Sequence, residues 1–172
     1  MNVNSLAAPS EAIRVHVALG SNLGDRAARL DQALKALERL AEVSSLDCSP
    51  WYETAPMGPT DQPAYLNAVC RFWTSLSPLA LLERLQRIEA EAGRRRPAAR
   101  WSARTLDLDL LLYGDRVIDV DRLRVPHPGL HERSFVLRPL LDLDPTLEVP
   151  GVNDLRARLE LVPDLGIRPY RR

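Results

Sequence analysis

Lysine is nearly absent from this 172-residue sequence: Lys35 is the only one, and the other strongly basic side chains are arginines. A P-loop nucleotide-binding protein needs a lysine directly after its glycine-rich loop, and a protein kinase needs one on a strand. Lys35 instead lies in an amphipathic segment four residues after Asp31, where a surface ion pair accounts for it. Both phosphotransfer machineries are therefore excluded, and any phosphate chemistry must depend on arginine and metal.

Cysteine, long apolar runs and net charge are also scarce. Cys48 and Cys70 show neither metal-ligand nor disulfide-framework spacing, so we expect reduced thiols. No apolar run approaches the roughly 20 residues that span a bilayer. Residues 1–14 contain no apolar signal-peptide core, so we expect a cytoplasmic protein with no membrane partner. The formal net charge of zero argues against general nucleic-acid binding.

Length and patterning predict one domain at residues 13–162, with a disordered tail at 1–12 and a C-terminal tail at 163–172. Alternation and short apolar runs predict strands at residues 13–19, 43–53, 65–74 and 107–113. Helical periodicity with capping residues predicts helices at residues 26–41 and 78–92. This order is typical of an α+β, ferredoxin-like sandwich with a mainly antiparallel sheet and the helices on one face.

The C-terminal part is expected to add smaller elements to this core. Residues 117–119 are predicted to form a short hairpin partner of the 107–113 strand across the Gly114-Asp115 turn. A short helix is expected within residues 135–143, and one or two helical turns at 153–161.

The stretch from Gly93 to Gly114 carries the strongest chemical signal. Its first half contains five arginines and no acidic residue: Arg94, Arg95, Arg96, Arg100 and Arg104. Its second half is a buried strand on which Asp107 and Asp109 face the same side, because side chains alternate along a strand. Two carboxylates on an apolar strand need a cation between them. That cation is either Mg²⁺ that also holds a polyphosphate, or the arginines in a purely structural network.

Other residues allow two interpretations each. Glu89 lies on the buried arc of the 78–92 helix and needs a cationic partner, either to orient the arginines or as a plain structural pair. Tyr65 and Asn67 suit a flat heterocycle or a cross-strand packing pair. The turn at residues 20–25 (GSNLGD) is a tight turn or an anion-binding loop. His127, between two prolines, is either aimed at a site or simply exposed.

Four segments together resemble the 6-hydroxymethyl-7,8-dihydropterin pyrophosphokinases of folate biosynthesis. They read VALGSNLGDR, YETAPMGPTDQPAYLNAV, IEAEAGRRRPAARWSARTLDLDLLLYG and VPHPGLHERSFVLRPL. The similarity runs from about Val15 to Pro145 in one unbroken order. It implies transfer of the terminal pyrophosphoryl group of ATP to the hydroxymethyl oxygen of the pterin, with release of AMP. It also implies that residues 54–64 and 93–103 are lids that exclude water.

The resemblance assigns roles to individual residues. Asp107 and Asp109 match ligands of two Mg²⁺ ions, and Arg94 and Arg104 match mobile-loop arginines of the catalytic site. The residues that match the pterin pocket are Thr54, Met57, Tyr65, Asn67, Trp101 and Phe135. The residues that match the nucleotide side are Gln86, Glu89, Arg96, Arg100, Leu110, His127 and Arg133.

The sequence departs from the family pattern at Ala55, Arg124 and Pro128, which bears on fine nucleotide contacts. We expect a monofunctional monomer whose partners are ATP and the pterin. A different class, a ferredoxin-like RNA-binding module that stacks bases on Trp101, is disfavoured by the neutral charge and by the acidic pair on the 107–113 strand.

Overall fold

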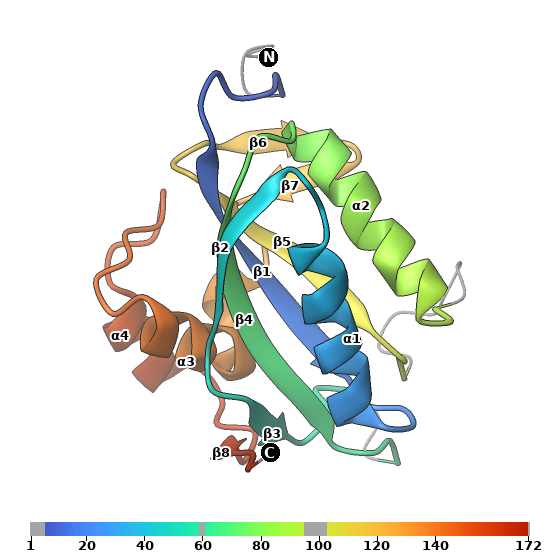
Figure 1. Cartoon of the computed structure of the whole chain (residues 1–172). Helices are drawn as coiled ribbons and strands as arrows, with labels where there is room; N and C mark the ends of the chain where they lie inside the picture. Colours follow the sequence, from blue (N-terminus) through green and yellow to red (C-terminus); the bar gives the residue numbers. More distant parts are fainter. Residues whose placement is uncertain (1–5, 59–60, 95–102, 172) are drawn as a thin grey trace.

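The computed structural model describes residues 6–58, 61–94 and 103–171 (Figure 1). Its centre is an antiparallel sheet in the order β5-β1-β4-β3-β8, with β2 also paired to β4. The strands of this sheet are β1 (Ile13–Ser21), β2 (Val43–Cys48), β3 (Tyr52–Thr54), β4 (Tyr65–Thr74), β5 (Asp107–Tyr113) and β8 (Arg168–Pro169). The prediction of a mainly antiparallel sheet with helices is confirmed.

The strand predicted at residues 43–53 is split into β2 and β3, which pair with different parts of β4. The break falls at Ser49–Trp51. Pro50 has no amide hydrogen to donate to a ladder. The Ser49 hydroxyl accepts a hydrogen bond from the Val69 amide at 3.1 Å and donates to the Pro50 carbonyl at 2.7 Å. A side chain thus replaces a missing ladder bond, and the chain re-enters the sheet as β3.

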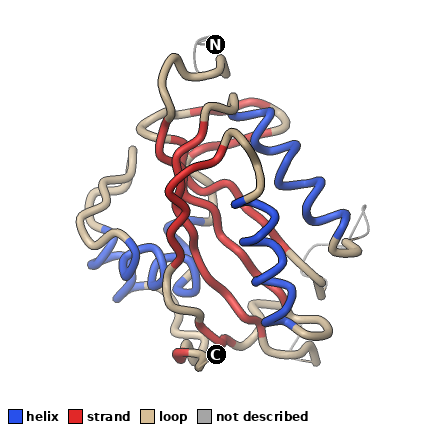
Figure 2. The backbone as a smooth tube through the Cα atoms, in the orientation of Figure 1, coloured by secondary structure: helices blue, strands red, loops and turns tan. Residues whose placement is uncertain are grey.

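Two helices cover one face of the sheet (Figure 2). Helix α1 (Arg26–Glu38) begins after Asp25, whose carboxylate accepts from the Ala28 amide at 3.0 Å. Helix α2 (Pro78–Glu91) begins after Ser77, whose hydroxyl accepts from the Ala80 amide at 3.3 Å. Their leucines pack with inward side chains of β1, β4 and β5; this core includes Val17, Leu19, Leu30, Leu37, Leu66, Leu81, Leu85, Leu108 and Leu110.

The expectation that the helices lie on one face is wrong for the C-terminal part. Helix α3 (Ser134–Leu143) covers the opposite face, with α4 (Leu155–Leu161) packed beside it (Figure 1). The reason is that β4 and β5 present apolar side chains on this face as well, chiefly Val69, Leu111 and Leu112, and these form a second core with α3. Strands that are apolar on both faces require a cover on each.

The predicted pairing of residues 117–119 with the 107–113 strand is also wrong. Strand β6 (Ile118–Val120) pairs with β7 (Leu123–Val125) instead. Only two residues separate β6 from β7, which suits a tight hairpin. The buried Ile118 and Val125 lie opposite each other and anchor this hairpin in the core beside α1 and α2.

The C-terminal segment ends in β8, which pairs with the free edge of β3. Within the described part of the chain, the helices are all too short or too polar to cross a lipid bilayer.

Candidate active site

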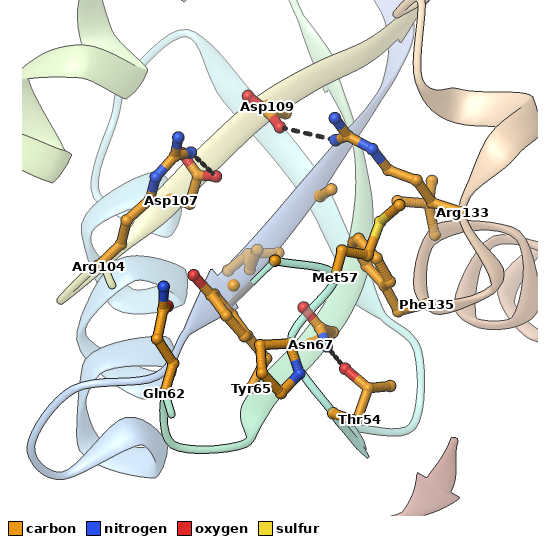
Figure 3. Close-up of a pocket in the computed structure, with 17 residues that line it drawn as sticks. Thr54, Met57, Gln62, Tyr65, Asn67, Arg104, Asp107, Asp109, Arg133 and Phe135 are labelled. Carbon is orange, nitrogen blue, oxygen red and sulfur yellow. Dashed lines mark hydrogen bonds and ion pairs between the residues drawn. The ribbon is translucent and has the colours of Figure 1, made fainter. Parts of the chain in front are cut away.

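A pocket opens on the α3 face of the sheet, between the ends of β1, β4 and β5, the loop after β3 and the start of α3 (Figure 3). Its lining residues are Ala18, Leu19, Gly20, Thr54, Ala55, Pro56, Met57, Gly58, Gln62, Tyr65, Asn67, Arg104, Asp107, Asp109, Arg133, Phe135 and Val136. Charged side chains gather at one end, and aromatic and amide side chains at the other (Figure 3).

The floor of the pocket is a row of residues that face each other across three strands. Gly20 of β1 lies opposite Asp107 of β5 on one side and opposite Asn67 of β4 on the other. Residues directly opposite in antiparallel strands share a face. A β-carbon at Gly20 would lie 3.3 Å from the Asn67 side-chain oxygen and 3.9 Å from the Asp107 β-carbon. The absence of a side chain here therefore makes room between the carboxylate end and the amide end.

Asp107 is held by two arginines that come from the ends of the arginine-rich stretch. Its Oδ1 accepts from Arg94 and its Oδ2 from Arg104. Arg94 Nη1 also contacts Glu89. The arginine–aspartate network that the sequence left open is therefore present in the structure, and two of its members, Asp107 and Arg104, line the pocket.

Glu89 is the buried end of this network, with 1% of its side chain exposed. Its Oε1 accepts from Arg94 and also from the Leu108 amide of β5 at 2.8 Å. The prediction that Glu89 pairs with a following arginine is confirmed. Because this glutamate binds both the β5 backbone and Arg94, it fixes that guanidinium relative to the strand that carries the two aspartates.

Asp109 has a different environment from Asp107. Its Oδ2 lies 3.8 Å from His127 Nε2 and 3.8 Å from Arg133 Nη1, and about a third of its side chain is exposed (35%). Burial and the charge of Asp107 raise the pKa of Asp109. Burial lowers the pKa of His127, although the Asp109 charge opposes this. The His127 Nδ1 accepts from the Gly129 amide at 3.0 Å, so the neutral ring carries its proton on Nε2, the atom nearest Asp109.

The opposite end of the pocket suits a flat polar ring. Tyr65 and Phe135 contribute aromatic faces, and Met57 contributes a flexible thioether (Figure 3). The buried Asn67 amide donates to the Thr54 hydroxyl at 2.8 Å. That bond orients the amide and leaves its oxygen toward the floor at Gly20.

Sequence reasoning missed Asn22, which is buried directly after β1. Its side-chain oxygen accepts from the Arg104 amide at 2.7 Å, and its own amide nitrogen donates to Gln62 at 3.2 Å and to the Pro63 carbonyl at 3.4 Å. Neither a tight turn nor an anion-binding loop gives the asparagine of GSNLGD a role. The signal in the sequence is that asparagine itself, whose side-chain amide can donate and accept at once.

The donor set fits a hard divalent cation shared with a substrate. Within residues 6–58, 61–94 and 103–171, no cluster of three or more histidine, cysteine, aspartate or glutamate side chains could hold a metal unaided. Mg²⁺ needs no such cage, because one or two carboxylates plus substrate phosphates hold it. Asp107 and Asp109 face one pocket, and the charge of Asp107 contributes to the raised Asp109 pKa, a repulsion that a cation would relieve.

The structure brings together most of the residues that the sequence singled out. Those that line the pocket are Thr54, Met57, Tyr65, Asn67, Arg104, Asp107, Asp109, Arg133 and Phe135, and those that contact its carboxylates are Arg94 and His127, with Glu89 behind Arg94. Leu110 packs in the core on the opposite face, and Gln86 of α2 does not line the pocket. Arg96, Arg100 and Trp101 lie outside the described residues.

The chain is similar in sequence to members of one known protein family. The family model of 7,8-dihydro-6-hydroxymethylpterin-pyrophosphokinase (HPPK) matches residues 16–145. The 2-amino-4-hydroxy-6-hydroxymethyldihydropteridine pyrophosphokinase of Pseudomonas aeruginosa is 48% identical over 154 residues, which cover 90% of this chain and 94% of that protein. The protein of the same name from Haemophilus influenzae is 48% identical over 139 residues, which cover 81% of this chain and 86% of that protein.

The chain also resembles parts of longer proteins. The folic acid synthesis protein of Schizosaccharomyces pombe is 44% identical over 156 residues, which are 90% of this chain but only 21% of that protein. A solved structure of Plasmodium falciparum HPPK-DHPS superposes with a TM-score of 0.71 at 14% identity, covering 92% of this chain and 45% of that one. That likeness concerns the fold. On the family match and the close relatives together, the chain belongs to the 7,8-dihydro-6-hydroxymethylpterin-pyrophosphokinase family.

Proposed function

We propose that this protein transfers the terminal pyrophosphoryl group of ATP to the hydroxymethyl oxygen of 6-hydroxymethyl-7,8-dihydropterin, releasing AMP, as a step of folate biosynthesis. The observation that carries the proposal is that one pocket has two chemically different ends. Its aspartate and arginine end can hold a polyphosphate, and its aromatic and amide end can hold a flat heterocycle. The family membership and the relatives' names agree with that chemistry.

The pterin binds at the aromatic end in this proposal. Tyr65 and Phe135 flank the ring, and the oriented Asn67 amide reads its polar edge. Gly20 leaves space on the floor for the hydroxymethyl group to approach the carboxylates. Binding of the ring would therefore place the attacking oxygen beside Asp107 and Asp109 without any movement of the sheet.

The triphosphate binds at the charged end. Arg104 and Arg133 line the pocket and can neutralise phosphate oxygens, as can Arg94 when it exchanges Asp107 for substrate. Asp107 and Asp109 would hold Mg²⁺, for which we propose two ions; when bound, the metal neutralises phosphate charge and lowers the pKa of the attacking hydroxyl. His127 would hold its Nε2 proton toward the same end.

Alignment of two substrates is the main catalytic task in this chemistry, because phosphoryl transfer requires positioning and charge neutralisation more than covalent participation. Holding two reactants in line can remove roughly 7–11 kcal/mol from a barrier. The sheet supplies this rigidity, since β1, β4 and β5 carry the floor and one of the two aspartates is tied to α2 through Arg94 and Glu89.

Two finer points belong to the proposal. The strand order β5-β1-β4-β2, with α1 and α2 on one face, supports the ferredoxin-like assignment of the core. We also propose that the protein acts as a monomer.

The test is product analysis. Purified protein with ATP, MgCl₂ and 6-hydroxymethyl-7,8-dihydropterin should form AMP and the pterin diphosphate in equal amounts, as followed by ion-exchange chromatography. ADP as the stoichiometric product, or ATP consumption that is independent of the pterin, would contradict pyrophosphoryl transfer. EDTA should abolish the reaction, and added MgCl₂ should restore it.

A further inference from the structure

The C-terminal segment is attached to the base of the loop that follows β3, which we call the β3–β4 loop (residues 55–64, described at 55–58 and 61–64). β8 pairs with β3 so that Arg168 lies opposite Glu53. The Tyr170 amide donates to the Trp51 carbonyl at 2.8 Å, and the Ala55 amide donates to the Leu165 carbonyl at 3.0 Å. The second bond fixes the first residue of the loop. Figure 1 shows the C-terminus beside β3, at the end of the sheet near this loop.

Glu53 connects this attachment to the other end of the same loop. One of its oxygens lies 2.5 Å from Arg168 Nη2, and the other lies 2.6 Å from Arg26 Nη2. Arg26 Nη1 also donates to the carbonyl of Ala64, the last residue before β4, at 2.7 Å. The two guanidinium groups lower the pKa of Glu53, that of Arg168 most. One carboxylate therefore ties together the C-terminal segment, the start of the loop and, through Arg26, its end.

The attachments of this loop matter because its described residues, 55–58 and 61–64, belong to no strand or helix. Its sequence APMGPTDQPA contains three prolines and a glycine, which cannot form regular structure. Yet Ala55, Pro56, Met57 and Gln62 all line the pocket at its aromatic end. The placement of these side chains therefore depends on where the loop joins β3 and β4, and Glu53 and Arg26 lie at those two junctions. Asn22 holds the same loop separately, through Gln62 and Pro63.

We propose that Glu53, Arg168 and Arg26 are positioning residues that hold the β3–β4 loop in the shape that binds the pterin, so that the C-terminal strand is part of the substrate site without touching substrate. This inference rests on the proposed function. None of the three side chains lines the pocket. Their ion pairs and hydrogen bonds lie at the junctions of the loop and do not involve Asp107, Asp109 or Arg133, so pterin binding should depend on them and nucleotide binding should not.

The test compares Arg168→Met, Arg168→Lys and Glu53→Gln with wild type. Arg122→Met is the control, because Arg122 lies in the turn between β6 and β7 and forms an exposed ion pair with Glu83 of α2 at 3.3 Å. Dissociation constants are measured by calorimetry for hydroxymethyl-dihydropterin, in the presence of a non-hydrolysable ATP analogue, and separately for that analogue. Amide hydrogen exchange at Ala55 reports directly on the loop junction, and thermal unfolding reports on the fold.

Arg168 is 73% exposed, so its loss should be moderate. We expect Arg168→Met to weaken pterin binding about 3-fold and Glu53→Gln about 10-fold, with faster exchange at Ala55. Affinity for the ATP analogue should stay within about 2-fold of wild type, and Arg168→Lys should recover most of the loss. Arg122→Met should match wild type in every measurement.

Three results would overturn the inference in distinguishable ways. Wild-type protein that neither binds nor converts the pterin removes the proposed function and this inference with it. An active wild type whose Glu53→Gln and Arg168→Met variants bind the pterin normally removes the inference alone. Equal losses of pterin and nucleotide affinity together with a lowered melting temperature would show that the three residues only stabilise the fold.

Discussion

Asn22 and Arg104 hold each other through two hydrogen bonds, although 82 positions separate them in the chain. The backbone amide of Asn22 donates to the Arg104 carbonyl at 3.0 Å, and the backbone amide of Arg104 donates to the Asn22 side-chain oxygen at 2.7 Å. Through its other side-chain atom, Asn22 also binds Gln62 and Pro63. One buried asparagine thus sets both the arginine that binds Asp107 and the end of the β3–β4 loop.

Replacing Asn22 by alanine should therefore impair both halves of the pocket. We expect kcat/KM for both substrates to fall by about 10- to 100-fold, because misplacement of catalytic groups by about 1 Å has effects of that size. Stability should drop by about 1–3 kcal/mol, since the part-buried Arg104 amide loses its acceptor. Steady-state kinetics and urea unfolding measure the two effects. Asn153→Ala, at an exposed position before α4, is the control. Unchanged kinetics in Asn22→Ala would show that the arginine is placed without it.

Replacing Asp107 and replacing Asp109 should have opposite effects on the stability of the fold but similar effects on the rate of the reaction. Asp107→Asn and Asp109→Asn should each lower turnover by several orders of magnitude if both bind metal. Asp109→Asn should leave the fold as stable as wild type or more so, because it removes a carboxylate whose pKa is raised by burial and by Asp107. Asp107→Asn should destabilise the fold, because Arg104 loses the carboxylate that it binds and Arg94 loses one of its two. Denaturant unfolding in the absence of metal tests the stabilities, and single-turnover kinetics tests the rates. Near-normal turnover in either variant would show that the replaced aspartate is not a metal ligand.

Local signals predicted the parts of the site that depend on strand periodicity. Asp107 and Asp109 face the pocket while Leu108 and Leu110 face the core, as alternation requires. The predicted bounds of the 65–74 strand agree with β4. These features follow from residues adjacent in sequence, for which side-chain spacing along an extended chain is sufficient.

Long-range choices could not be predicted in the same way. The pairing of β6 with β7 rather than β5 was decided by which apolar residues could be buried together, not by the Gly114 turn. Placement of α3 on the second face depended on apolar side chains spread over β4 and β5. Asn22 was missed because its partners, Arg104 and Gln62, are distant in sequence, and only the folded sheet brings them together.

His16 should make the stability of the fold depend on pH. It is buried on β1 with Asp144, Arg14 and Arg71 around it, and burial lowers its pKa from 6.5 to about 4 although Asp144 opposes this. In the unfolded chain His16 therefore binds a proton below about pH 6.5, whereas in the folded protein it does so only below about pH 4. Stability falls as pH decreases through this window, at most by about 1.4 kcal/mol per pH unit and about 3 kcal/mol in all.

The measurement is the free energy of unfolding in urea at intervals between pH 4 and 7. His16→Gln should show a flatter profile across the window than wild type, whereas His131→Gln, at a more exposed position in the short 3₁₀ helix Leu130–Glu132, should keep the wild-type slope. Parallel profiles for wild type and His16→Gln would contradict the prediction, because they would mean that His16 binds its proton equally well in the folded and unfolded states.

Arg94 and Arg104 both bind Asp107, yet their surroundings predict different consequences when each is removed. Arg94 is mostly buried and also pairs with the buried Glu89, so Arg94→Ala removes a cation from that carboxylate and should cost about 3–5 kcal/mol of stability. Arg104 lines the pocket and is more exposed, so Arg104→Ala should leave stability nearly unchanged. Its effect should appear in kcat, because a guanidinium that leaves Asp107 for substrate phosphates contributes most when charge builds up on them.

The Arg104 effect separates into rate and binding. We expect kcat to fall at least 100-fold in Arg104→Ala, while the dissociation constant of a non-hydrolysable ATP analogue changes by less than about 5-fold. Arg104→Lys should recover little, because a lysine cannot reproduce the two-pronged geometry of guanidinium. Arg116→Ala, remote from the pocket and close to the Tyr113 ring, is the control. If ATP affinity and kcat fell by the same factor, Arg104 would bind the nucleotide equally in the ground state and the transition state. Its pairing with Asp107 would then be part of a preformed nucleotide site, and Arg104 would not move from Asp107 to the phosphates during the reaction.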